Sequence, residues 1–343
     1  MTGSTDQMST DIVLTGITTT GTPHLGNYVG AIRPTVAASH DAGVQSFYFL
    51  ADYHALVKNQ DPERLRQSSL EVAATWLALG LDTDQAVFYR QSDIPEIPEL
   101  TWVLSSVTAK GLLNRAHAYK AAVAENEEAG DRNPDKGITM GLFGYPVLMT
   151  ADILMFNANK VPVGRDQKQH VEMVRDIAHR FNRIYGDTFT LPKAVIDDNT
   201  AVLSGIDGRK MSKSYNNTIP LFEPSKKLRK LIMKIKTNSL EPGEPKDTEG
   251  STVFEIYRSI AAPEETRAMQ QKFAEGIGWG DAKQELFEYL DAHLSGPREE
   301  YNRLKANPAH VESVLQSGAQ RAREIAAPFM QKVRTAVGIR ALG

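Results

Sequence analysis

Two short strings in the sequence have residue types and a spacing that could do chemistry. The first is Thr22-Pro23-His24-Leu25-Gly26-Asn27, in a Thr- and Gly-rich loop between a candidate strand and a candidate helix. Such a loop binds phosphate in open parallel sheets, because the start of the helix carries unpaired N–H donors. His24 and Asn27 could add directed hydrogen bonds to phosphate or ribose oxygens. Alone, the string is more typical of an ordinary turn with a surface histidine.

The second string is Lys210-Met211-Ser212-Lys213-Ser214, which follows the turn Gly205-Ile206-Asp207-Gly208. Mobile ammonium groups in such a loop can close over a leaving pyrophosphate, because phosphoryl and adenylyl transfer depend on positioning and on neutralising charge. A solvated basic loop is the alternative interpretation. The five-residue string is rare by chance, and this rarity favours the functional interpretation.

In this order, the two strings resemble the ATP-binding signatures of the class I aminoacyl-tRNA synthetases. The resemblance extends over nearly the whole chain. It implies an enzyme that joins an amino-acid carboxylate to the α-phosphate of ATP and then transfers the amino acid to the terminal ribose of a tRNA. The residues that would stabilise charge in the first step are His24, Asn27, Lys210 and Lys213. Lys120 matches a catalytic lysine of the family that meets the ATP phosphates, and a solvated surface lysine is the alternative.

A third group of residues indicates which amino acid is activated. Tyr145, Met149 and Asp152 are spaced i, i+4 and i+7, so they would share one face of a helix beginning near Pro146. Such a face could be an ordinary core with one buried acid. An unpaired buried carboxylate is costly, however, and an N–H or O–H of a substrate would satisfy it.

The segment Val161–His170 resembles the Gly-x-Asp-Gln segment shared by the tryptophan and tyrosine synthetases. In that subgroup, Tyr145 and Gln167 would hold the α-amino group of the substrate. Asp166 would approach the ribose, and Asp152 would accept a hydrogen bond from the substrate ring.

Apolar residues at two positions favour tryptophan over tyrosine. Met149 stands where the tyrosine enzymes typically carry glutamine, and Leu14 stands where their first strand carries a tyrosine. The string Gly26–Ala31 also resembles the bacterial tryptophan enzymes. Two departures from these enzymes are Leu14, where many carry phenylalanine, and Thr18, where many carry glutamine. A tyrosine–tRNA ligase stays an alternative, as does a synthetase-like paralogue that binds RNA without charging it.

The resemblance assigns further residues to each substrate. The expected ATP-binding residues are Thr18, Thr20, His24, Gly26, Asn27, Gly164, Asp166, Gln167, Val202, Lys210, Met211, Ser212 and Lys213. The expected tryptophan-binding residues are Leu14, Gly16, His54, Tyr145, Met149, Asp152, Val161, Val163 and Gln167. The acids near these positions are scattered and predict no metal site in the protein. Mg²⁺ would therefore arrive with ATP, held mainly by its phosphates.

Alternating strands and helices must position these residues. A capping Asp, a proline and an acid at Asp61-Pro62-Glu63 are typical of a helix start. The alternation predicts an α/β fold with a Rossmann-like, doubly wound parallel sheet, and the pattern from Val253 onward is helical. Candidate strands cover residues 11–16, 45–51, 86–89 and 159–163, and a candidate helix covers residues 28–39.

We expect three parts along the chain. A Rossmann-like catalytic domain would span residues 11–217, with a dimer-interface insertion roughly over 91–145. An α-helical anticodon-binding domain would span residues 218–311. A C-terminal helix within residues 312–343 would pack back on the catalytic domain. The resemblance also implies a homodimer.

The bulk composition is that of an ordinary globular protein. The chain has 343 residues, a net charge of -3 and no cysteine, which fits about two domains in a reducing, cytoplasmic environment. Its N-terminus lacks the features of a signal peptide, and no membrane-spanning segment is expected. The partners that the resemblance implies are L-tryptophan, ATP, tRNA(Trp) and a second copy of the chain, and no membrane is expected as a partner.

The charge is unevenly distributed. Residues 209–236 contain nine Lys or Arg and one acid, so the local charge is nine minus one, or +8. A basic stretch in an otherwise acidic chain is suited to tRNA phosphates. The alternative is that these residues only keep a helix soluble.

Overall fold

The structure, a computed structural model, describes residues 11–164, 167–196 and 202–342. Its centre is a five-stranded sheet in the order β3-β2-β1-β4-β5, with neighbouring strands parallel. This confirms the expected Rossmann-like sheet and adds β5, which the sequence pattern did not predict. The strands are β1 (Asp11–Thr18), β2 (Val44–Ala51), β3 (Val87–Arg90), β4 (Lys160–Pro162) and β5 (Lys193–Val195).

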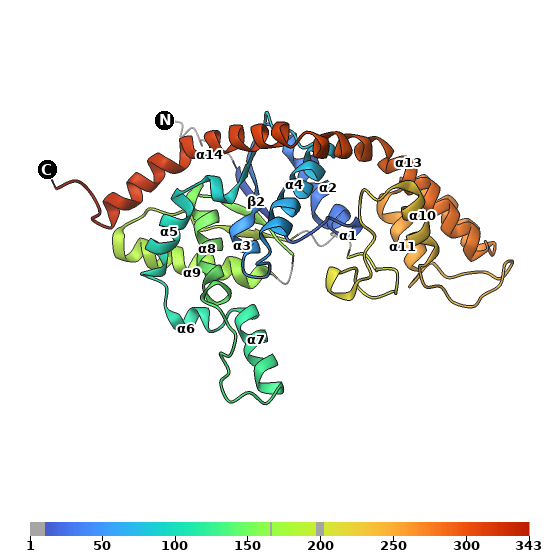
Figure 1. Cartoon of the computed structure of the whole chain (residues 1–343), viewed down its shortest axis with the longest axis horizontal. Helices are drawn as coiled ribbons and strands as arrows, with labels where there is room; N and C mark the ends of the chain where they lie inside the picture. The colour runs from blue at the N-terminus through green and yellow to red at the C-terminus, as the bar shows by residue number, and fades with distance from the viewer. Residues whose placement is uncertain (1–10, 165–166, 197–201, 343) are drawn as a thin grey trace, which may run out of the picture.

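Helices cover both faces of the sheet and then form most of the C-terminal part (Figure 1). Up to β5 they are α1 (Leu25–Asn27), a π-helical turn (Tyr28–Ile32), α2 (Arg33–Ser39), α3 (Asp52–Ala55), α4 (Pro62–Ala78), a 3-10 turn (Gln91–Asp93), α5 (Glu96–Ser105), α6 (Lys110–Leu113), α7 (His117–Glu128), α8 (Met140–Met155) and α9 (Lys168–Tyr185). After β5 they are a 3-10 turn (Lys213–Tyr215), α10 (Ser225–Met233), α11 (Thr252–Ile260), α12 (Pro263–Ala274), α13 (Trp279–Ala306) and α14 (Pro308–Ala336).

The two faces of the sheet bury separate apolar layers, because side chains alternate along each strand. On β2, Phe47 and Phe49 belong to a layer shared with α5, α8 and α9. Tyr48 and Leu50 belong to the opposite layer, which continues through α4 into α10, α11 and α13. The sheet and the C-terminal helices therefore share one continuous core.

Two expected helices differ from the sequence prediction in detail, both at a proline. Helix α8 begins at Met140 rather than near Pro146, because the Thr139 hydroxyl caps it by accepting the Leu142 N–H at 3.2 Å. The helix expected over residues 28–39 starts with a π-turn, in which the Arg33 N–H reaches the Tyr28 carbonyl, five residues back. The cause is the next residue, a proline, which has no N–H to continue the regular ladder.

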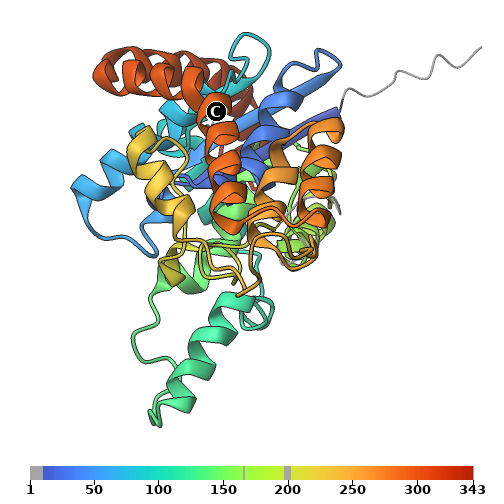
Figure 2. The same ribbon diagram turned by 90° about the vertical axis from the view of Figure 1, so that its right-hand side faces the viewer.

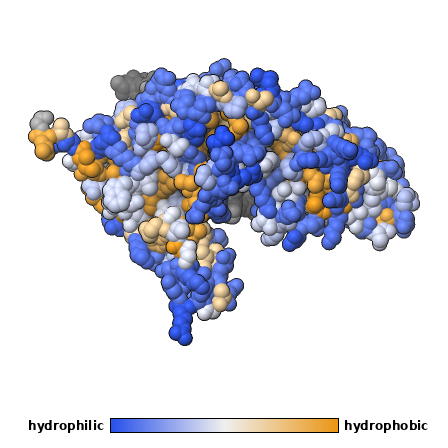
Figure 3. Space-filling view, viewed as in Figure 1, coloured by the Kyte–Doolittle hydropathy of each residue, from blue (hydrophilic) through white to orange (hydrophobic). Residues whose placement is uncertain are grey.

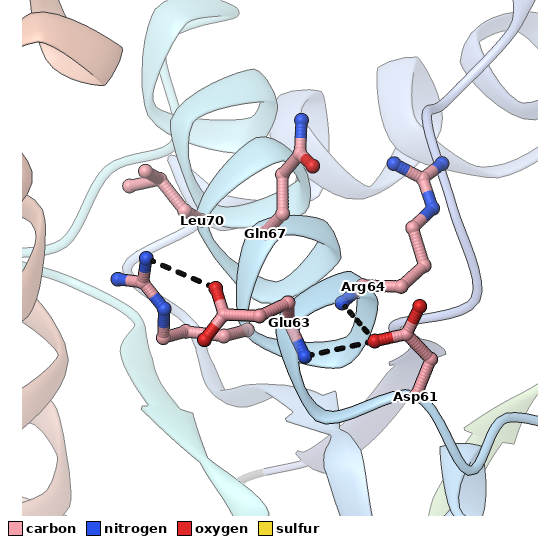
Figure 4. Close-up of a pocket in the computed structure, with 6 residues that line it drawn as sticks. Asp61, Glu63, Arg64, Gln67 and Leu70 are labelled. Carbon is pink, nitrogen blue, oxygen red and sulfur yellow. Dashed lines mark hydrogen bonds and ion pairs between the residues drawn. The ribbon is translucent and has the colours of Figure 1, made fainter.

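The start of α4 is the one that the sequence predicts. Asp61 caps the helix, and its carboxylate accepts the N–H groups of Glu63 and Arg64 at 3.0 and 3.1 Å. Figure 4 shows this cap, with the Arg64 and Glu63 side chains extending to different sides of the helix. The cap fixes the first turn of α4. It thereby sets which side chains of the helix, beginning with Arg64, point toward the rest of the molecule.

Helices α13 and α14 run along the molecule and connect its two ends (Figure 1). α13 contacts α4, α10 and α11, and α14 contacts α4, α5, α8 and the edge strand β3. Gly318 permits the close approach of α14, because a Cβ atom there would lie 1.7 Å from the Phe88 carbonyl oxygen. Arg321 holds the helix by donating to the Thr83 carbonyl at 2.6 Å. The exposed edge of the sheet is thereby covered.

Helix α7 projects from the body of the molecule in both ribbon views (Figures 1 and 2). It has no buried residue. Apolar surface gathers on the sheet half near the base of this projection (Figure 3). Two apolar side chains of this half are unusually exposed, namely Trp102 on α5 at 75% and Met140 on α8 at 79%.

Candidate active site

The carboxyl end of β1 is open on one face, although β1 is the central strand. Leu14 is buried, but Gly16 and Thr18, which follow it on the same face, are exposed. Gly16 pairs in register with Phe49, and a Cβ atom at Gly16 would lie 2.4 Å from the Phe49 ring. Open parallel sheets bind ligands at the carboxyl ends of their strands. The candidate site therefore begins at residues that the sequence assigned to tryptophan and ATP.

The first signature string follows β1 directly, and His24 caps α1. His24 Nδ1 accepts the Asn27 N–H at 3.4 Å, while the Asn27 side chain accepts the His24 N–H at 3.2 Å. Burial, and then the charge of Lys213, lower the pKa of His24 to about 4. The imidazole is therefore neutral at pH 7, and its proton is on Nε2, where it can be donated to a phosphate oxygen.

The expectation that this helix start offers free N–H donors is wrong. The Leu25 N–H donates to the Ile219 carbonyl at 2.9 Å, and the Gly26 N–H donates to Met211 Sδ at 3.4 Å. The Asn27 N–H is bound to His24. All three N–H groups already donate to protein acceptors. Two of these acceptors come from the second signature and the segment after it, which pack against this loop. Side chains, rather than these backbone groups, are left to contact a phosphate.

The two signature strings meet although they are 185 residues apart. We call this contact region the signature junction, made of Thr20, Gly26, Met211 and Lys213. Met211 is buried beneath Gly26, and Lys213 Nζ donates to the Thr20 carbonyl at 3.3 Å. Desolvation, and then the charge of Arg64, lower the pKa of Lys213. The junction brings a lysine beside the first signature loop.

Asn217 organises the second signature, and the sequence analysis did not single it out. Its side chain is buried, accepts the Ser212 N–H at 2.8 Å, and donates to the Lys210 carbonyl at 3.1 Å. It also donates to Asp207 at 2.7 Å, and this hydrogen bond is the main cause that lowers the pKa of Asp207 to about 2. Lys210 itself is exposed, as is Val202.

Asp152 is the centre of a second group of residues, which we call the Asp152 network: His54, Gln91 and Asp152. The carboxylate is buried, lies 2.8 Å from His54 Nε2, and accepts the Gln91 amide at 2.8 and 3.0 Å. The sequence analysis expected a substrate donor to satisfy this acid, but the protein itself already supplies two donors. A carboxylate offers about four acceptor positions, so one further donor still fits.

Gln91 was missed in the sequence, although it is the first residue after the apolar strand β3. It is fully buried, and its Oε1 accepts the Tyr53 N–H at 3.1 Å. This contact turns the amide NH₂ group toward Asp152. Burial raises the pKa of Asp152, and the His54 hydrogen bond opposes that rise. A polar residue directly after a buried strand was the available signal.

Tyr145 lies beside this network and begins a second chain of hydrogen bonds. Its hydroxyl is 2.5 Å from His170 Nε2, and His170 Nδ1 is 2.7 Å from Gln167 Oε1. The Tyr145 and His54 rings meet edge to face, with centroids 6.3 Å apart. Tyr145 and Gln167, which the sequence grouped together, are thus joined through the buried His170, which the sequence did not assign.

The other predicted residues are distributed around these two groups. Leu14 and Val161 are buried, whereas Met149 and Val163 are half-buried against the same apolar layer. The Gly164 carbonyl accepts the Gln167 N–H at 2.9 Å. Asp166 lies outside the described residues.

Lys120 is exposed on α7, the projecting helix, which contacts α8. Among the described residues, no side-chain hydrogen bond or ion pair joins it to the signature junction.

Within residues 11–164, 167–196 and 202–342, there is no group of three His, Asp or Glu side chains that could hold a metal ion. In the same described ranges, no helix is long and apolar enough to cross a membrane.

Comparisons with known proteins agree with this geometry. The family described as tRNA synthetases class I (W and Y) matches residues 8–295. A tryptophan–tRNA ligase of Pseudomonas aeruginosa is 61% identical over 96% of this chain and 74% of its own length. One of Neisseria meningitidis is 58% identical over 98% of this chain and 100% of its own length.

A solved structure gives the same result. The tryptophanyl-tRNA synthetase of Campylobacter jejuni, complexed with ADP and tryptophan, superposes with a TM-score of 0.86 at 44% identity. The match covers 95% of this chain and 99% of that one. The chain therefore belongs to the class I tRNA synthetases of the tryptophan and tyrosine group, and within that group to the tryptophan–tRNA ligases.

Proposed function

We propose that this tryptophan–tRNA ligase activates L-tryptophan at the open carboxyl end of β1, between the signature junction and the Asp152 network. The tryptophan carboxylate attacks the α-phosphate of ATP, forming tryptophanyl-adenylate and releasing pyrophosphate. The terminal ribose of tRNA(Trp) then takes the tryptophanyl group. The observation that supports this location is the meeting of the two signature strings, at Met211 with Gly26 and Lys213 with Thr20.

At the phosphate side, neutral His24 donates from Nε2 and Lys213 supplies a positive charge. Neither residue forms a covalent bond to the substrate, so their effect is to stabilise negative charge as it moves to the pyrophosphate. Exposed Lys210 can follow that group as it leaves, since lysine acts as a point charge that tolerates a changing geometry. Mg²⁺ enters with ATP and is held mainly by its phosphates.

At the amino-acid side, Asp152 accepts the indole N–H. His54 and Gln91 hold the carboxylate in place, so its remaining acceptor position has a fixed direction. Tyr145 and Gln167, joined through His170, receive the α-amino group of tryptophan. Leu14 and Met149 provide apolar contacts for the indole.

The C-terminal helical half binds the tRNA. Exposed basic residues of α10, including Lys226, Lys227 and Lys230, form a positively charged face for tRNA phosphates. The enzyme acts as a cytoplasmic homodimer, and exposed Trp102 and Met140 are apolar residues that a second copy would cover.

Tryptophan-dependent exchange of pyrophosphate into ATP tests the proposal directly. Exchange should require L-tryptophan and should be much weaker with L-tyrosine. Stronger exchange with tyrosine would show that the amino-acid assignment is wrong. RNA binding without any exchange would instead support a paralogue that does not charge tRNA.

A further inference from the structure

Glu71 on α4 is a buried carboxylate outside the residues assigned to either substrate. Its side chain is 5% exposed, and it has four polar neighbours. Oε2 accepts the Thr22 hydroxyl at 2.7 Å and lies 4.0 Å from Arg64. Oε1 accepts the Gln67 amide at 2.9 Å and lies 3.6 Å from Lys305 Nζ. A buried acid with this many partners is costly to form, because each group must be desolvated.

These neighbours come from three different parts of the chain. Thr22 belongs to the first signature loop, two residues before His24. Arg64 and Gln67 belong to α4, and Figure 4 shows both extending from that helix. Lys305 belongs to α13, the long helix of the C-terminal half. One carboxylate therefore links the ATP-side loop to the helical half that is proposed to bind tRNA.

The link does not duplicate a direct contact. Among the described residues, no hydrogen bond or ion pair joins Thr22 to Lys305. Both instead line a cavity of about 390 Å³, together with Glu71, Phe222 and Tyr301. Lys305 Nζ also lies over the Tyr301 ring, 5.2 Å from its centroid, which fixes the position of the ammonium group. Next to Thr22, the Pro23 carbonyl accepts the Leu221 N–H at 3.0 Å, so the carboxylate adds a side-chain link to a loop whose backbone is held from the other side.

The same carboxylate lies within electrostatic reach of the signature junction. Arg64 is close to the Gly21 backbone, where an added Cβ atom would lie 3.1 Å from its guanidinium and 3.5 Å from Lys213 Nζ. Two cations thus meet beside the first signature loop. The Glu71 carboxylate lies 4.0 Å from the Arg64 guanidinium, and its negative charge offsets part of the repulsion between Arg64 and Lys213.

We propose that Glu71 is a positioning residue for adenylate formation, which fixes the first signature loop relative to α13 by sharing its carboxylate between Thr22 and Lys305. The role rests on the proposed location of ATP at the signature junction. Glu71 does not touch the substrate in this arrangement. It acts through Thr22 on the backbone that presents His24, and a small misplacement of such a loop is costly for catalysis.

Glu71→Gln is the first test, because it keeps the shape of the side chain and removes its charge. A neutral amide cannot accept from Thr22 on one atom and attract Lys305 on the other, since one of the two atoms is now a donor. We expect kcat/KM for ATP, per active site, to fall about tenfold in pyrophosphate exchange, with the KM for tryptophan unchanged. Active-site titration supplies the concentration of folded sites.

Glu63→Gln is the matched control, on the same helix and with the same chemical change. The Glu63 side chain is 82% exposed and pairs only with the exposed Arg66 among its described neighbours. Its kinetic constants should equal those of the native enzyme. If Glu71→Gln lowers only the number of titratable sites and leaves the constants per site unchanged, Glu71 merely stabilises the fold and the proposal is wrong.

A double-mutant cycle tests whether the carboxylate is the link. Thr22→Val and Lys305→Met each remove one end of it, and each should lower kcat/KM for ATP about fivefold. The double variant should have nearly the same kcat/KM for ATP as either single variant, because both substitutions break the same link through Glu71. In a Glu71→Gln background the two changes should no longer be coupled. Independent effects in the native background would overturn the proposal. A native chain without tryptophan-dependent exchange would instead overturn the proposed function.

Discussion

The Asp152 network and the signature junction, between which the proposed function places the substrates, are built differently. In the Asp152 network, buried side chains hold one another, and the contacts join α3, the 3-10 turn after β3 and α8 within the sheet half. In the signature junction, backbone groups and the ends of long side chains join two loops 185 residues apart. One region is a fixed polar core, and the other is a contact between surface loops.

The difference follows from what each region must bind. A site that selects one ring by a single hydrogen bond needs an acceptor whose direction is fixed, and burial with several partners provides this. A site that follows a departing pyrophosphate needs positive charges that can move with it. We therefore expect changes at the junction to act mainly on rate, and changes in the network to act mainly on choice of amino acid.

The largest effect is expected from Lys213→Ala at the junction. Removing a cation that stabilises developing charge typically costs two to three orders of magnitude, so exchange should slow by about 10³-fold. Tryptophan binding, measured by equilibrium titration without ATP, should change less than about twofold. Glu63→Gln again serves as a control. Near-normal exchange in the Lys213 variant would remove the distinction between the two regions.

Asp152→Ala should have the next largest effect, and it should act on selectivity. The variant loses the acceptor for the indole N–H and leaves the Gln91 amide unpaired, so discrimination against phenylalanine should fall by about 100-fold. The ratio of kcat/KM for tryptophan and phenylalanine measures this. Unchanged discrimination would show that the apolar contacts, and not the carboxylate, select the ring.

Gln91→Leu tests the Asp152 network separately from the signature junction, and its effect should be smaller than that of Asp152→Ala. Asp152 would keep His54 but lose its second donor and its fixed direction, so kcat/KM for tryptophan should fall about tenfold. The kcat for saturating tryptophan should change little, because Gln91 does not face the phosphates. A selective loss of kcat would contradict the assignment of Gln91 to the amino-acid side.

The smallest expected effect is on stability and concerns His24. Its pKa in the folded protein is about 4, below the ordinary value of 6.5, so between these values the unfolded chain binds more protons. Stability should therefore fall as the pH falls through this window, by about 1 kcal/mol between pH 6 and pH 5. Chemical denaturation at the two pH values measures this. His24→Gln should remove that part of the pH dependence. If the unfolding free energy of this variant changes with pH as much as that of the native chain, the assignment to His24 is wrong.

Local signals were the ones that the sequence made recognisable. His24 and Lys213 are recognisable because each occurs in a short local string, and the cap by Asp61 is likewise local. The helix that carries Tyr145 and Asp152 was predicted to start six residues too late, since Pro146 looked like a first residue. Thr139, which supplies the true cap, is a less conspicuous signal than a proline.

The sequence by itself determined the fold class, the two signature strings and the family, because strand and helix periodicity and short strings are local properties. Only the tertiary structure showed that the N–H groups of α1 are already used, that Asp152 is satisfied by Gln91 and His54, and that Glu71 links Thr22 to Lys305. These facts depend on which polar groups meet after burial, between residues as far apart as Glu71 and Lys305, 234 positions along the chain. A buried polar side chain needs a partner, but its identity does not follow from neighbours in the chain.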